Sequence, residues 1–126
     1  MNVAFARNEY VNTKSNSVGD KSDNIEAISI ALDQLIVSMK NLKTTIDIEQ
    51  KDALFEKSLT TIYFLQKCLD FEAGGELAKN LFRVYEFSRQ SILDFVLRNK
   101  GSENMDKSVE YVTLVQEGWN ELKNIN

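Results

Sequence analysis

Residues 25–46 read IEAISIALDQLIVSMKNLKTTI, and this stretch decides the fold class. Apolar residues recur in it at steps of three and four, the spacing that places side chains on one face of an α-helix. Asp23 precedes the run and Glu26 follows three residues later, a capping-box pattern that predicts a helix start at this point. The predicted inward face consists of Ile25, Ile28, Leu32, Leu35, Met39, Leu42 and Ile46.

The apolar surface of this first helix is wider than one stripe. Beyond the inward face, the helix also carries Ile30, Ala31, Ile36 and Val37. The third helical pattern of the chain shows a similar excess at Phe82, Phe87, Leu93 and Leu97. A broad apolar stripe is normal for a helix in a globular core, and an exposed binding groove would also require such a broad apolar surface. The pattern leaves both interpretations open.

Three further helices are predicted after the first. Asp47, with Gln50 three residues later, predicts the N-cap of the second helix, and Ser102 predicts the N-cap of the fourth. The third helix runs from about Glu76 to residues 98–101, where two cations suit a helix C-terminus and a glycine suits the left-handed residue after it. The apolar residues of the second helix are Leu54, Phe55, Leu59, Ile62, Tyr63, Leu65 and Leu69. Those of the third are Leu77, Leu81, Val84, Tyr85, Ile92, Phe95 and Val96, and those of the fourth are Met105, Val109, Val112, Val115, Trp119 and Leu122.

Two adjacent glycines interrupt the helical sequence between the second and third helices. Because glycine costs about 1 kcal/mol relative to alanine inside a helix, the pair predicts a connection. Gly74 is expected to take the positive φ that ends the second helix, and Gly75 to let the chain turn. Glu76 would then lie in the first turn of the third helix, near the positive end of its dipole. We therefore assign Asp70, Gly74, Gly75 and Glu76 to a structural turn.

Four helices with short connections predict neighbours that run antiparallel. The expected fold class is all-α, an antiparallel up-down four-helix bundle formed by residues 23–126. Residues 1–22 are polar and weakly patterned, and we expect them to form a mobile N-terminal arm. A chain of 126 residues is long enough for one domain with one core.

Composition argues against several classes of function. The chain has no histidine, which removes His-dependent triads, the commonest general base and the commonest metal ligand. A net charge of −4 disfavours a nucleic-acid partner, and no apolar run is long enough for membrane insertion. Cys68 is the single cysteine, and the N-terminus has no signal-peptide pattern, so we expect a cytoplasmic protein. We expect no enzymatic activity, no catalytic residue, no cofactor and no bound metal.

Two groups of charged residues have both a functional and an ordinary explanation. An acidic group can bind a metal or transfer protons, but helix capping and solvation explain it as well; it consists of Asp70, Glu72 and Glu76. A basic group near the first connection can meet an acidic partner or simply form a solvated face. It consists of Lys40, Lys43 and Lys51.

The segment from Leu69 to Leu81 resembles the signature of the FliS family of flagellar export chaperones. The matching residues are Leu69-Asp70-Phe71-Glu72, Gly74-Gly75-Glu76-Leu77-Ala78 and Asn80-Leu81. Shorter matches are Tyr10, Asp47-Ile48-Glu49, Val84-Tyr85-Glu86-Phe87 and Gly118-Trp119. The resemblance therefore covers about residues 10–122.

The resemblance implies a four-helix bundle, in agreement with the helical patterns, and it also implies a function. A family member would be a cytoplasmic chaperone that binds the disordered C-terminal segment of flagellin one to one, delays its polymerisation and aids its delivery to the flagellar type III export gate. Apolar grooves between helices would hold this segment, and the chaperone without cargo would be a monomer or a weak dimer. The residues that we predict to contact cargo are Tyr10, Ile25, Ile28, Leu32, Leu69, Phe82 and Tyr85.

The first helix departs from the family pattern. The family commonly has Met-Leu-Tyr-Asp-Gly-Ala where residues 30–35 read IALDQL. Asp33 is kept, whereas Leu32 stands in place of the tyrosine and Gln34 in place of the glycine. The change at Gln34 matters because a small residue lets another backbone approach closely. Two alternatives follow: a chaperone or regulator of another disordered secreted partner, and a self-associating structural bundle.

The N-terminal arm carries the aromatic residues Phe5 and Tyr10. It is either a frayed terminus or a lid that covers an apolar groove until cargo displaces it. If the arm is a lid, deletion of residues 1–20 should raise cargo affinity or the tendency to aggregate, as measured by calorimetric titration and light scattering. A deletion that changes neither quantity would contradict the lid.

Overall fold

The computed structural model describes residues 21–125, and these residues form four α-helices. The helices are α2 (Lys21–Thr44), α3 (Ile48–Lys67), α4 (Phe71–Leu97) and α5 (Ser102–Ile125). Over this range there is no strand, so the all-α prediction is confirmed. The predicted N-terminal arm, with Phe5 and Tyr10, lies outside the described residues except for its last two positions, which already belong to α2.

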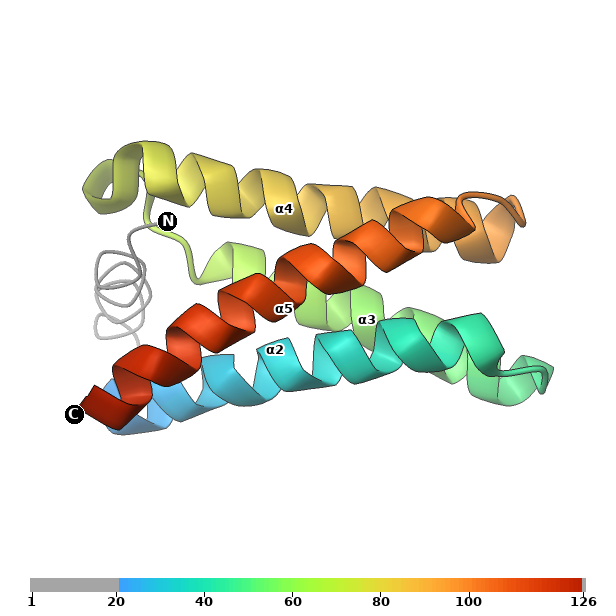
Figure 1. Ribbon diagram of the computed structural model, residues 1–126, viewed down its shortest axis with the longest axis horizontal. Coiled ribbons are helices and arrows are strands. Elements are labelled where there is room, and N and C mark those ends of the chain that lie inside the picture. The colour runs from blue at the N-terminus through green and yellow to red at the C-terminus, as the bar shows by residue number, and fades with distance from the viewer. Residues whose placement is uncertain (1–20, 126) are drawn as a thin grey trace.

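The helices alternate in direction along one long axis, and each packs against two neighbours in the ring order α2–α3–α4–α5 (Figure 1). The connections are short, as an up-down bundle requires: residues 45–47, 68–70 and 98–101. The first and last of these lie at one end of the bundle, and residues 68–70 lie at the other. The predicted antiparallel up-down four-helix bundle is therefore confirmed.

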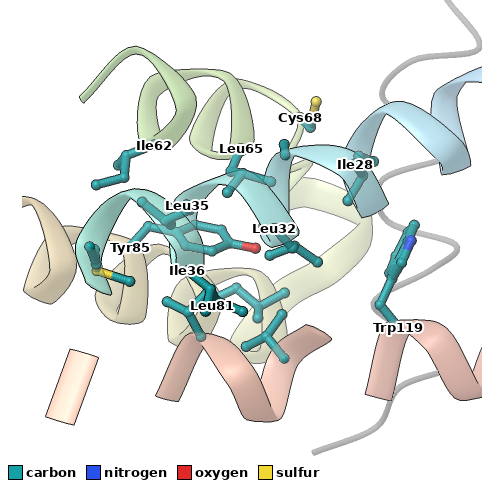
Figure 2. Close-up of a cluster of buried hydrophobic side chains, with 14 of the residues drawn as sticks. Ile28, Leu32, Leu35, Ile36, Ile62, Leu65, Cys68, Leu81, Tyr85 and Trp119 are labelled. Atoms are coloured by element: carbon teal, nitrogen blue, oxygen red, sulfur yellow. The ribbon is translucent and has the colours of Figure 1, made fainter. Parts of the chain in front are cut away.

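The inward face of α2 forms one wall of the core. Ile28, Leu32, Leu35, Met39 and Leu42 are completely buried, as their spacing predicts. Figure 2 shows the ring of Tyr85 from α4 lying among Leu32, Leu35 and Leu81. The rest of the bundle buries Ile62, Leu65, Leu69, Ile92, Met105, Val112, Val115 and Trp119 in the same core.

Two residues predicted to face the core are exposed instead. Ile46 is 96% exposed because α2 ends at Thr44, so the helical spacing no longer determines where this side chain points. Tyr63 is 62% exposed because it follows Ile62, and adjacent residues of a helix lie about 100° apart. Tyr63 also lies beneath the ammonium group of Lys67, 5.6 Å from the ring centre.

Polar groups connect the helices at two places in the core. The indole Nε1 of Trp119 in α5 donates to the backbone carbonyl of Ile25 in α2 at 3.2 Å. The buried hydroxyl of Ser108 hydrogen-bonds with that of Ser88 in α4 and with the sulfur of Met39 in α2, the latter at 3.2 Å. Because buried polar groups are costly without partners, these contacts favour a single arrangement of α2, α4 and α5.

The helix starts agree with the predictions in part. Asp47 caps α3 by accepting a hydrogen bond from the backbone N–H of Gln50 at 3.1 Å, as predicted. α2 begins at Lys21, so Asp23 lies within the helix rather than before it. α5 begins at Ser102, and its first backbone bond runs from Met105 to the carbonyl of Gly101, so Gly101 occupies the capping position predicted for Ser102.

The connection between α3 and α4 corrects the prediction for the glycine pair. α3 ends at Lys67, well before the glycines. Asp70 then caps α4, because its carboxylate accepts from the N–H groups of Glu72 and Ala73 at 3.0 and 3.1 Å. The connection is therefore residues 68–70, and both glycines lie beyond it.

Gly75, rather than Gly74, has the positive φ. Its φ and ψ are 53° and −128°, and this conformation kinks α4 after its first turn. Gly74 is buried inside that turn and does not end α3. The turn is also held by its first residue, Phe71, whose ring packs edge-on against Phe82 with the ring centres 5.8 Å apart. Glu76 follows the kink, so it does begin the long straight part of α4.

Replacing Gly75 by alanine tests the kink. A Cβ atom at this position would meet no atom within 4 Å, so the only cost is the strained backbone. We expect Gly75→Ala to lower the free energy of unfolding by about 1–3 kcal/mol in urea denaturation. If Gly75 were an ordinary helical residue, the same change would raise stability by about 1 kcal/mol, and that sign would contradict the kink. Ala53→Gly, in the exposed regular part of α3, calibrates the helix-propensity effect alone.

Candidate functional site

A groove runs along the outer surface between α2 and α3, the neighbouring helices in the lower part of Figure 1. It contains two hollows of about 230 and 240 Å³. The first hollow is lined by Ala27, Ile30, Ala31, Gln34, Thr60, Thr61 and Phe64. The second is lined by Asp33, Gln34, Val37, Ser38, Asn41, Leu54 and Lys57. These residues define the α2/α3 groove, and Gln34 lines both hollows.

Ile30 and Val37 give the groove exposed apolar surface. They are 46% and 54% exposed, whereas the apolar residues on the inward face of the same helix are buried. Because Val37 follows Ile30 by seven residues, about two helical turns, both side chains lie on the same side of α2. Leu54 and Phe64 of α3 are partly buried on the opposite wall. Apolar residues gathered in one groove are a typical surface for a protein partner.

Part of the wall of the first hollow consists of small side chains and of a hydroxyl that already has a hydrogen-bond partner. Ala27 and Ala31 extend only to Cβ on the α2 side. On the α3 side, the hydroxyl of Thr61 donates to the carbonyl of Lys57 within its own helix at 2.7 Å. A ligand in this hollow would not have to satisfy that hydroxyl, so an apolar side chain is a suitable occupant.

The second hollow has a charged rim. The carboxylate of Asp33 accepts a hydrogen bond from the side-chain amide of Gln116 in α5, which fixes this edge of the groove to the neighbouring helix. Lys57 lines the α3 side of the hollow and is exposed. The second hollow therefore suits an apolar group with a polar neighbour better than a purely apolar one.

None of the described residues predicted to contact cargo lines this groove. Ile28, Leu32 and Tyr85 are fully buried in the core, and Leu69 is nearly so. Ile25 and Phe82 are partly buried and pack against the core from its edge, and Tyr10 lies outside the described residues. A client could contact the four buried residues only if helices separated, so their role in binding stays a prediction.

The acidic and basic groups have structural roles within the bundle. Asp70 is a helix cap, and Glu76 forms an exposed ion pair with Lys79 at 3.6 Å. Lys43 pairs with Asp106 of α5, and Lys51 lies over the ring of Phe95 of α4, 5.5 Å from its centre. Within the described range, no group of three or more acidic, cysteine or histidine residues is placed to hold a metal ion.

Outside the groove, Arg89 forms a surface ion pair and Cys68 is buried. Arg89 Nε donates to the carboxylate of Glu86 at 2.6 Å, and this hydrogen bond and the negative charge of Glu86 raise the pKa of Arg89. Cys68 is a buried cysteine at the end of α3. None of the described helices combines the length and hydropathy needed to cross a membrane.

Comparison with known proteins places this bundle in a family. The sequence model of the family described as "Flagellar protein FliS" matches residues 6–126. The chain belongs to the FliS family. A relative from Vibrio cholerae serotype O1, named flagellar secretion chaperone FliS, is 30% identical over 66 residues. The match covers 52% of this chain and 48% of the relative, so the chain spans about half the length of the curated relative that it matches. No solved structure matches the chain.

The stretch from Leu69 to Leu81, which carries the most specific FliS resemblance, builds one end of the bundle. Leu69 and Leu81 are buried in the core, Asp70 caps α4, and Gly75 kinks it. Phe71 packs against Phe82 just beyond the motif. The most specific FliS-like stretch of this chain therefore determines how α3 connects to α4, and it lies outside the residues that line the α2/α3 groove.

Sequence reasoning identified only part of the groove. The apolar excess on the first helix was expected at Ile30, Ile36 and Val37; Ile30 and Val37 are exposed, whereas Ile36 is buried. The α3 side was missed because Thr60 and Lys57 belong to no apolar pattern. Only the position of Lys57 could have indicated it, since Leu54, Lys57, Thr61 and Phe64 follow one another at steps of three and four on one face of α3, a series that leaves out Thr60.

A pair of alanine substitutions separates core from groove in this FliS-family chain. Leu32→Ala removes a fully buried side chain and should lower the free energy of unfolding by about 2–5 kcal/mol. Ile30→Ala, two residues earlier on the outer face, should lower it by less than about 1 kcal/mol. Urea denaturation of both variants measures the difference. Equal losses would mean that Ile30 is part of the core and that the groove is not open.

Proposed function

We propose that this chain is a cytoplasmic flagellar export chaperone that binds the disordered C-terminal segment of flagellin, one molecule to one. In this proposal the chaperone delays flagellin polymerisation and aids delivery to the flagellar type III export gate, and it acts by binding without catalysis. Membership of the FliS family supports the chaperone role, as does the name of the Vibrio cholerae relative. The structural observation that carries the proposal is the exposure of Ile30 and Val37 in a groove between two firmly packed helices.

The groove has suitable dimensions for an amphipathic helix. Its lining on α2 runs from Ala27 to Asn41, about 21 Å at 1.5 Å per residue, or about four helical turns. An amphipathic segment that folds in such a groove buries its apolar face against the receptor, the helix-in-groove mode of recognition. Ordering a disordered segment costs about 2–5 kcal/mol or more, so the contact must bury a large apolar area.

The residues predicted to contact cargo enter this proposal in three ways. Ile25 and Phe82, at the edges of the core, are accessible to a client that extends beyond the α2/α3 groove. Ile28, Leu32, Leu69 and Tyr85 would stabilise the core of the bundle rather than contact the client in the closed bundle. Tyr10 keeps its proposed role as part of a lid or as a contact.

A second candidate is a chaperone for another disordered secreted partner. The observation that favours it is Gln34, which stands where the family commonly has glycine and lies in the middle of the groove. A self-associating bundle is the third possibility, and size-exclusion chromatography separates it from the other two. A client chaperone should elute as a monomer or weak dimer and form a one-to-one complex, whereas a structural assembly should be oligomeric by itself.

Calorimetric titration tests the proposal directly. The probe is a peptide covering about the last 50 residues of the flagellin encoded in the same genome. One-to-one binding with a negative heat-capacity change, together with a gain of helix in circular dichroism, is the expected result. Absence of binding at tens of micromolar would contradict the flagellin proposal and favour a different client.

A charge placed in the groove should weaken this binding. Val37→Asp adds a carboxylate to the apolar wall of the second hollow and should reduce affinity at least tenfold, because it must be desolvated under the client. Leu114→Asp is the matched control, since Leu114 is 57% exposed on α5, away from the lining of the groove. Calorimetry measures both variants, and circular dichroism verifies their folding. Equal effects of the two substitutions would show that the client does not occupy the α2/α3 groove specifically.

A further inference from the structure

Gln34 divides the α2/α3 groove into two parts. Its side chain is exposed and lines both hollows, whereas each of the other lining residues belongs to one hollow. It lies four residues after Ile30 and three residues before Val37, so it stands between the two exposed apolar side chains on the same face of α2. A client that occupies both hollows must pass over this amide.

The distance between the hollows matches the repeat of a helix. From the lining of the first hollow to that of the second, α2 advances by about six residues and the antiparallel α3 goes back by about six, so the hollows lie about 9 Å apart along the groove. A bound α-helix lying along the groove has the same rise, so its residues i and i+7, about 10.5 Å apart on one face, reach both hollows. Its residue i+3 or i+4 then faces Gln34.

The chemistry of Gln34 restricts what can face it. The amide has two donors and an acceptor that water satisfies when the groove is empty. A bulky apolar side chain above Gln34 would remove this water without replacing its hydrogen bonds, and it would also clash with the Gln34 side chain. A glycine, alanine or serine at this position of the client leaves room for the amide. The amide can then hydrogen-bond with the client backbone or with water.

Charge distinguishes the two hollows. The first has no charged lining residue, whereas the second has Asp33 and Lys57. Asp33 is engaged by Gln116 of α5, and Lys57 takes part in none of the ion pairs formed by the described residues. An acidic side chain beside the second anchor therefore complements the rim of that hollow.

We propose that Gln34 is a specificity-determining residue of the α2/α3 groove. The segment it selects is an amphipathic helix with two large apolar residues seven positions apart, a glycine, alanine or serine midway between them, and an acidic residue next to the anchor that enters the second hollow. This inference rests on the proposed function, because the client is taken to be a disordered flagellar protein segment. It adds the pattern that the segment must carry.

Compensating substitutions test the role of Gln34. The probe is the flagellin C-terminal peptide, together with a series in which each glycine, alanine and serine is changed singly to leucine. For one position, leucine should weaken binding to the wild-type chaperone at least tenfold, and Gln34→Ala should restore affinity to within threefold of the unmodified peptide. Gln90→Ala, an exposed glutamine on α4, is the matched control and should restore nothing.

The role of Lys57 is tested with the same peptide. Lys57→Gln should weaken binding about threefold at low salt and reduce its dependence on salt, because one exposed ion pair is lost. An unchanged salt dependence would remove the acidic residue from the proposed pattern.

The outcomes distinguish this inference from the proposed function. Binding of the unmodified peptide with no leucine position rescued by Gln34→Ala overturns the role of Gln34 and leaves the chaperone proposal intact. Failure of the wild-type protein to bind the unmodified peptide at tens of micromolar overturns the flagellin proposal, and this inference falls with it. A rescued position flanked by apolar residues three or four positions away on each side supports both.

Discussion

Helix α2 carries apolar side chains over more of its circumference than its two neighbours cover. Its inward face is held by the core and by polar contacts from α5, including the bond from Trp119 to the carbonyl of Ile25. Because this side is fixed, the outer side presents Ile30 and Val37 in one arrangement before any client arrives. A preformed groove lowers the cost of binding, since the receptor loses little conformational freedom, and the client alone must become ordered.

Two parts of the chain stand out in the sequence, and they have separate roles in the structure. The stretch from Leu69 to Leu81, which carries the FliS resemblance, caps and kinks α4 and so fixes the geometry of one bundle end. The outer face of α2, where the sequence departs from the family pattern, lines the groove. Under the proposed function, the architecture of a FliS-family bundle and the choice of its client are thus encoded in different helices. A change at Gln34 can alter the client without disturbing the core.

Patterns within single helices predicted the fold, whereas features that depend on contacts between helices were predicted only in part. The spacing of Ile28, Leu32 and Leu35 and the cap at Asp47 depend on one helix only, and both predictions are confirmed. The glycine pair was predicted to form the connection before α4 but lies inside α4, because the cap at Asp70 begins the helix before the glycines, a competition between two local signals. The groove was predictable as an excess of apolar residues on the first helix. Its hollows were not, because Thr60, Thr61 and Phe64 come from another helix and their depth depends on how the two helices pack.

In the proposed complex, a client helix binds to the outside of a bundle that stays closed. Methyl NMR of the protein with labelled Ile, Leu and Val, titrated with the flagellin C-terminal peptide, tests it most directly. We expect large shifts and intermolecular contacts for the methyl groups of Ile30 and Val37, with the pattern of contacts among Leu32, Leu35 and Leu81 preserved. Loss of those core contacts, or strong shifts centred on Leu114 while Ile30 and Val37 stay unchanged, would contradict it.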